Sequence, residues 1–164
     1  MSLEGILRYS IRAAIFALVI LAIYFLFHKI TGRKINYFSM LAIFYLGALI
    51  QITVIRGGIE LTGERDPWQM EPLIWTIYQL RGGWWTFFYP LLGNIFWFVP
   101  MGVILGRKFN LWITVLLAGL ISFSIEVLQW LFRNGVSDID DIIFNLIGAF
   151  LGYLLYYIVS KRKN

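Results

Sequence analysis

Residues 111–132 read LWITVLLAGLISFSIEVLQWLF, an apolar run in which Glu126 is the one charged residue. About 20 apolar residues in a helix are enough to span the hydrocarbon core of a bilayer. Within lipid, every backbone N–H and C=O group needs a partner inside the segment or inside a closed barrel. This run is continuous and lacks the alternation of a barrel strand. We therefore predict that it forms a transmembrane helix.

Further apolar runs lie on both sides of this stretch, at residues 11–27, 38–55, 88–106 and 142–159. Hydrophobic residues make up 60% of the chain and charged residues 14%, whereas a soluble domain carries about 25% charge. The mean hydropathy is +0.76. These values predict an all-α fold, a polytopic membrane helix bundle of about five transmembrane helices. Residues 1–164 are expected to form a single transmembrane domain.

The amino-acid composition also excludes several kinds of functional site. The chain has no cysteine and one histidine, His28, so thiol chemistry and a two-histidine metal site within one chain are excluded. No cofactor is expected. The net charge is +5, but the basic residues form short clusters between apolar runs, a pattern that suits anionic lipid head groups better than nucleic acid. Membrane lipids are therefore the expected partners.

The distribution of Lys and Arg predicts the orientation, because cytoplasmic loops are enriched in these residues. Three clusters without acidic neighbours would share one side: Lys29, Arg33, Lys34, Arg107, Lys108, Lys161, Arg162 and Lys163. Most Arg residues of the other side share their loops with Asp and Glu. We expect an N-terminus outside and a C-terminus in the cytoplasm.

The long connection at 56–87 would then lie outside. It holds Trp68, Trp75, Tyr78, Trp84 and Trp85. Such side chains favour the membrane–water interface. Residues 71–80 are expected to form a short interfacial helix that ends at Gly82 and Gly83.

Polar residues, which are unfavourable inside a bilayer, lie near this same side of the membrane. A charge at the bilayer centre costs about 2.5–3.5 kcal/mol on insertion scales. Glu126, Gln129 and Arg133 share one helical face. Arg56, which follows the second apolar run, is the expected partner of Glu126 because an Arg fork fits a carboxylate.

The loop after Arg133 begins with a turn at Asn134-Gly135. Ser137 or Asp138 can cap the last helix, with acidic residues in its first turn. The third apolar run, at 88–106, adds Asn94 and Pro100. Pro100 has no backbone N–H group and so removes one hydrogen-bond donor from the helix. The candidate ligand-binding residues are therefore Arg56, Asn94, Pro100, Glu126, Gln129, Arg133, Asp138, Asp140, Asp141 and Asn145.

Each of these residues also has a purely structural interpretation. The aspartates can serve as helix caps, Glu126 with an Arg can hold helices together, and Asn94 and Asn145 can bond helix to helix. The Trp-rich loop can be a membrane anchor. The hypothesis of a functional site rests on the convergence of all these groups at one membrane face.

The order Arg56, then NIFWFVPMG at 94–102, then EVLQ at 126–129 and DIDD at 138–141 resembles the VanZ-like membrane protein family. The similarity covers residues 45–153. It implies a bacterial or archaeal inner-membrane protein and a contribution to resistance against teicoplanin, a lipid-tailed glycopeptide. The family's characteristic residues carry over to Arg56, Asn94, Pro100, Glu126, Gln129, Asp138, Asp140, Asp141 and Asn145.

Three functional hypotheses follow. The first is an outer-leaflet pocket that binds a lipid-tailed glycopeptide or a lipid-linked cell-wall precursor. The second is an enzyme acting on a lipid head group, with Glu126 as the catalytic acid or base and a divalent cation on Asp138, Asp140 and Asp141. The third is a small transporter or flippase subunit, which the nearly apolar cytoplasmic half disfavours. The sequence leaves the oligomeric state open.

Overall fold

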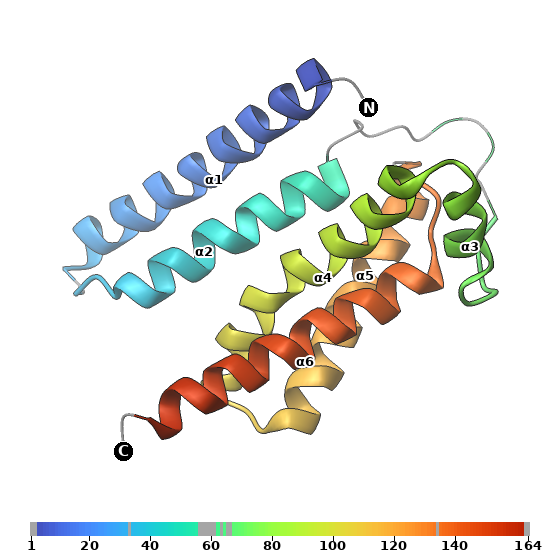
Figure 1. Cartoon of the computed structure of the whole chain (residues 1–164). Coiled ribbons are helices and arrows are strands. Elements are labelled where there is room, and N and C mark those ends of the chain that lie inside the picture. The colour runs from blue at the N-terminus through green and yellow to red at the C-terminus, as the bar shows by residue number, and fades with distance from the viewer. Residues whose placement is uncertain are drawn as a thin grey trace. The chain divides into compact units, whose positions relative to one another are not determined.

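The computed structural model describes residues 3–32, 34–55, 62, 64, 67–133 and 135–162, and its secondary-structure elements are helices (Figure 1). The chain forms two compact units, Met1–Ile59 and Glu60–Asn164. Each unit has its own internal packing.

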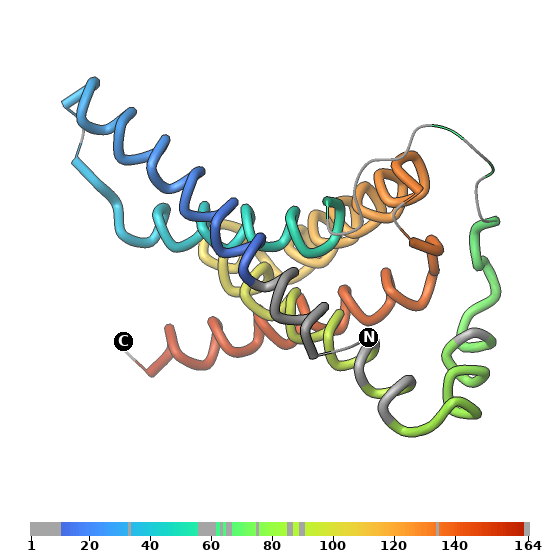
Figure 2. Tube along the Cα trace, turned by 90° about the horizontal axis from the view of Figure 1, so that it is seen from above, coloured from blue at the N-terminus to red at the C-terminus, as the bar shows by residue number. Residues whose placement is uncertain are grey.

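The first unit is a helical hairpin. Helix α1 (Leu3–Thr31) packs against α2 (Tyr37–Ile50), which continues as a π-helical turn, η1 (Gln51–Ile55) (Figures 1 and 2). Ala17 is fully buried, and a Cβ atom added to Gly47 would lie 3.4 Å from the Cα atom of Ala17. Small residues at this crossing therefore let the two helices approach closely.

The second unit contains α3 (Ile74–Arg81), α4 (Trp84–Gly106), α5 (Leu111–Phe132) and α6 (Ile139–Lys161). Helix α6 packs closely along α4 and also contacts α5, while the short α3 contacts α4 (Figure 1). Because the connections from α4 to α5 and from α5 to α6 are short, α5 runs antiparallel to both, and α4 and α6 therefore run parallel to each other.

At three glycines, α4 and α6 approach each other so closely that backbone meets backbone. A Cβ atom added to Gly102 would lie 2.0 Å from the Ala149 carbonyl oxygen, and one added to Gly152 would lie 2.0 Å from the Val99 oxygen. Gly148 meets α4 in the same way. These positions tolerate no side chain, so glycine sets the distance between the two helices.

Local signals explain where the helices begin. The side chain of Asn36 accepts hydrogen bonds from two amides at the start of α2, and Asn110 Oδ1 accepts one from Ile113 N at 3.0 Å. Asp138 caps α6. Short polar side chains at these positions satisfy amides that the first helical turn leaves unpaired.

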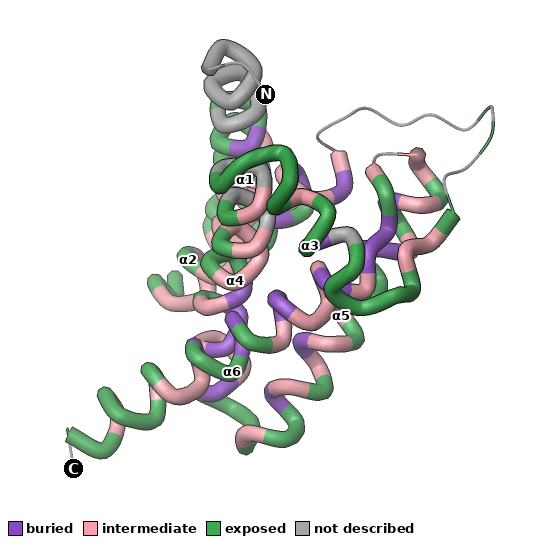
Figure 3. Tube along the Cα trace, turned by 45° about the vertical axis from the view of Figure 1, so that its right-hand side comes forward, coloured by how far each residue is buried: buried purple, intermediate pink, exposed green. Residues whose placement is uncertain are grey.

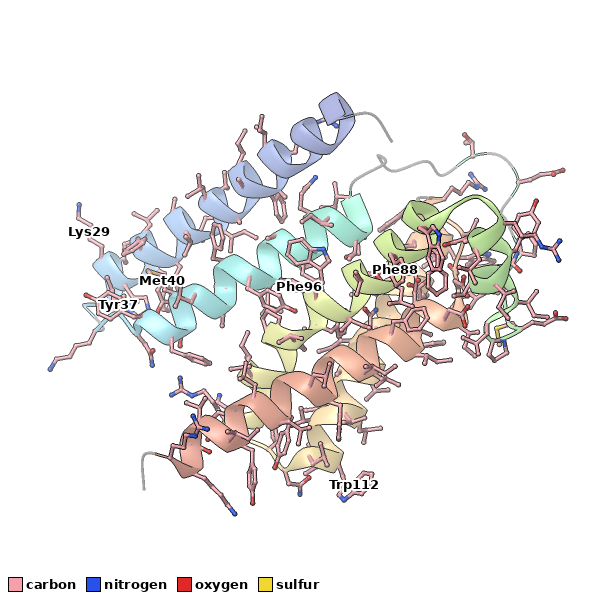
Figure 4. All side chains as sticks on the ribbon, viewed as in Figure 1. Lys29, Tyr37, Met40, Phe88, Phe96 and Trp112 are labelled. Atoms are coloured by element: carbon pink, nitrogen blue, oxygen red, sulfur yellow. The ribbon has the colours of Figure 1, made fainter. Side chains whose placement is uncertain are left out.

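Four helical segments of the described chain are long and apolar enough to cross a membrane: Ile11–Thr31, Tyr37–Ile55, Leu111–Phe132 and Ile139–Lys161. Helix α4 adds a shorter apolar part, Leu91–Gly106. Exposed and partly exposed positions cover much of each helix (Figure 3). Phe96 and Trp112 are each 80% exposed (Figure 4). Large apolar side chains on the outside fit a lipid environment, so the predicted polytopic helical fold is confirmed.

The predicted boundaries agree with the helices to within a few residues, apart from the first. Residues 111–132 coincide with α5, whereas α1, α4 and α6 begin earlier than their apolar runs. The short helix predicted at 71–80 is α3, and Gly82 ends it. The second run ends in a π-helical turn, which hydropathy alone does not signal.

Candidate functional site

The buried face of α5 carries polar side chains along much of its length. Thr114 and Ser122 are fully buried, Glu126 is 1% exposed, and Gln129 is also buried. Their spacing of eight, four and three residues keeps them on one side of the helix. In a membrane this face must lie against protein, because polar groups that face lipid lose their hydrogen bonds.

Glu126 holds the loop that joins α5 to α6. Its Oε2 atom accepts a hydrogen bond from the Asp138 amide at 3.1 Å. Its backbone carbonyl accepts one from the Ser137 hydroxyl at 2.8 Å. Ser137 is 1% exposed. The buried carboxylate therefore fixes the point at which the chain turns into α6.

Asp138 is the N-cap of α6, and its Oδ1 accepts from the Asp140 amide at 2.9 Å. Burial raises the pKa of Asp138 above its ordinary value, and the neighbouring charge of Asp140 raises it further. The hydrogen bond from the Asp140 amide acts in the opposite direction. The Asp138 carboxylate therefore caps α6 in surroundings that disfavour its charged form.

Asp140 ties α3 to α6. Its Oδ1 accepts from the Leu73 amide at 2.8 Å, and its Oδ2 accepts from the Thr76 hydroxyl. Leu73 is the N-cap residue of α3, so a carboxylate from α6 occupies the N-terminal end of that helix. This placement satisfies an unpaired amide and complements the helix dipole.

The segment before α3 pairs with the same loop. The Gln69 amide donates to the Ser137 carbonyl at 2.9 Å, and the Ile139 amide donates to the Gln69 carbonyl at 3.1 Å. The rings of Trp68 and Phe123 lie 5.8 Å apart. Residues 68–76 are therefore anchored on α5 and α6 by backbone, side-chain and ring contacts.

Two asparagines link helices within the unit. Asn94 of α4 donates to Asp141 Oδ1 of α6. Asn145 of α6 donates to the Ser122 hydroxyl of α5 at 2.8 Å, and Asn145 is 4% exposed. Within the described residues, the Asn145 Oδ1 atom has no hydrogen-bond donor. One end of the unit thus joins α3, α4, α5 and α6 through polar groups.

We call this region the polar end. Its members are Asn94, Glu126, Gln129, Ser137, Asp138, Asp140, Asp141 and Asn145, with Leu73 and Thr76 from the α3 segment.

The remaining three candidates, Arg56, Pro100 and Arg133, form no side-chain hydrogen bond within the polar end as described. Arg56 lies outside the described residues, so its predicted pairing with Glu126 stays a prediction. Pro100 is exposed on α4 and adds no donor to the polar end. Arg133 ends α5. Among the described residues, no three His, Cys, Asp or Glu side chains form a group suited to a metal ion.

Several residues that form or adjoin these buried polar contacts have no clear sequence signal. Thr76 lies in a mostly apolar stretch, and the role of Gln69 is carried by its backbone. Ser137 was expected only as an alternative cap. Thr114 is a fully buried hydroxyl near the end of α5 remote from Glu126, so that half is less apolar inside than the sequence suggests.

Apolar helices with large exposed side chains and a polar end define a multi-pass membrane protein. The sequence model of the VanZ/LLP1 family matches residues 13–160, and the chain belongs to this family. It is similar to Protein VanZ of Enterococcus faecium, with 32% identity over 85 residues, 47% of this chain and 50% of that protein. The chain thus matches about half the length of that relative. No solved structure matches the chain.

Proposed function

We propose that the polar end binds the head group of a lipid-tailed amphiphile in the outer leaflet and that the apolar helix surfaces hold its tail. The observation that carries the proposal is the convergence of polar groups from four helices at one end of the second unit. Polar groups are costly within a membrane and are usually kept where they serve a function.

The α3 segment supports an amphiphilic ligand. Thr76 faces the polar end, whereas Ile74, Ile77 and Tyr78 are exposed. A helix with these two sides lies naturally at the lipid–water boundary. A ligand with a polar head and an apolar tail would meet matching surfaces on both sides of this boundary.

By capturing such compounds, the protein would lower the amount of teicoplanin that reaches its membrane target. Family membership and the similarity to Protein VanZ favour this role. A lipid-linked cell-wall precursor would present the same combination of head and tail, and it is the second ligand to test.

The contacts of Glu126 favour binding over catalysis on a lipid head group. Its carboxylate already accepts the Asp138 amide, so it acts as an anchor for the loop. Glu126→Gln keeps one acceptor oxygen but removes the acid and base chemistry. Full ligand binding and full resistance with this variant would support a binding site, whereas loss of resistance with intact binding would favour the enzyme.

The test uses the full-length protein in nanodiscs of phosphatidylcholine. We expect saturable binding of teicoplanin and much weaker binding of the same glycopeptide without its acyl tail. Asn94→Ala should weaken binding, and Gly93→Ala on the same helix is the matched control because no described atom lies within 4 Å of that position. Binding no greater than partitioning into protein-free nanodiscs would refute the proposal.

A further inference from the structure

Arg133 occupies a backbone position that usually favours glycine. It ends α5 with φ 52° and ψ 40°, in the left-handed region. Its amide donates to the carbonyls of Gln129 and Trp130, which closes the helix. Glycine adopts this conformation without steric cost, while an arginine does not. The backbone conformation at this position therefore does not explain the presence of an arginine.

The guanidinium is also unusual in its surroundings. Its Nε and Nη1 atoms are buried, and neither has a hydrogen-bond partner in the part of the chain that the structure describes. An arginine that merely extended toward water would expose these nitrogens. One that merely complemented the helix dipole would donate to the last carbonyls of α5. Buried cationic donors without acceptors are costly, so an acceptor beyond the described residues is expected.

The carboxylates of the polar end already have donors. Glu126 accepts from the Asp138 amide, Asp138 from the Asp140 amide, and Asp141 from Asn94. Asp140 accepts from the α3 segment. The acidic groups thus hold the backbone of the polar end together. Among the described residues, Arg133 therefore has two buried donors, Nε and Nη1, that no acceptor occupies.

We propose that the ligand of the polar end carries an anionic oxygen group, a phosphate or a carboxylate, and that Arg133 binds it. This inference rests on the proposed function and specifies its ligand class. Planar guanidinium matches such oxyanions in charge and geometry. Arg133 directly follows Phe132, the last residue of an apolar helix, which is where the head group of a membrane-inserted ligand would lie.

The experiment measures binding of two short-chain lipids with identical tails, phosphatidic acid and the uncharged diacylglycerol that lacks its phosphate, to the protein in micelles of a maltoside detergent, which carry no phosphate. We expect the wild type to prefer phosphatidic acid by about tenfold, as one charge-assisted hydrogen bond can provide. Arg133→Gln and Arg133→Gly should abolish the preference. Arg81→Gln, which removes an exposed cation from the last turn of α3, should retain it.

The glycine variant guards against misfolding, because glycine suits the left-handed conformation and should keep or raise stability. Equal saturable binding of both lipids to the wild type would overturn the anionic class but leave the proposed function standing. Saturable binding of neither lipid nor teicoplanin would overturn both. Equally effective competition by inorganic phosphate would refute a lipid as the source of the oxyanion.

Discussion

Two stretches of α6 differ in what they contact: the glycines meet the backbone of α4, whereas Asn145 meets the Ser122 side chain of α5. Toward α4, Gly148 and Gly152 leave no room for even a methyl group. Toward α5, Asn145 donates to Ser122, and its oxygen has no donor among the described residues. The first contact is complete in itself and fixes geometry. The second retains hydrogen-bonding capacity, so the glycines of α6 belong to the scaffold and Asn145 belongs to the candidate site.

The largest expected effect is at the glycine contact. Gly102→Val would push a side chain into the Ala149 carbonyl and should destabilise the fold by about 3 kcal/mol or more. Unfolding in mixed detergent micelles measures the loss. Gly93→Ala on the same helix should change stability by less than about 1 kcal/mol. Equal effects of the two substitutions would show that α4 and α6 are not in backbone contact.

The next effect concerns α3. Asp140→Ala removes the acceptor of the Leu73 amide and the Thr76 hydroxyl, and we expect a local loss of about 2–3 kcal/mol. Hydrogen exchange of the amides at 69–81 should accelerate, while α5 keeps its protection. Asp140→Asn should show a smaller change because it keeps one acceptor. Glu71→Ala, at an exposed acid of the same segment, should have no effect.

A smaller effect is expected where α5 and α6 share a hydrogen bond. Hydrogen bonds between membrane helices contribute about 0.6 kcal/mol on average. A double-mutant cycle with Ser122→Ala and Asn145→Ala should therefore give a coupling near this value. Unchanged binding by both variants would assign the pair to the scaffold, and weakened binding at normal stability would assign it to the site.

The smallest effect should be a pH dependence from Asp138. Because its pKa is raised in the folded protein, the folded state binds more protons than the unfolded chain between the ordinary and the raised value. Stability should fall as pH increases through that window. Asp138→Asn keeps the cap and should flatten the dependence, as measured by detergent unfolding across acidic pH. A steeper fall in the variant would contradict the assigned cause.

Local patterns predicted much of the fold. The boundaries of α5 follow from hydropathy, and the start of α6 follows from a capping aspartate, since both signals lie within a few residues. The partners of Asp140 lie in the α3 segment, more than 60 residues away, and no periodicity relates them. The sequence also did not predict the left-handed conformation of Arg133, because the Asn-Gly pair that follows it indicated a turn one residue later.

The central claim is that distant parts of the chain meet at the polar end, and cysteine cross-linking tests it directly because the native chain contains no cysteine. We expect the pair Asn94→Cys with Asp141→Cys, and the pair Thr76→Cys with Asp140→Cys, to form disulfides on mild oxidation in membranes. The pair Thr76→Cys with Thr114→Cys should stay reduced. Cross-linking of this third pair, or of none of the three, would contradict the assembly of the polar end.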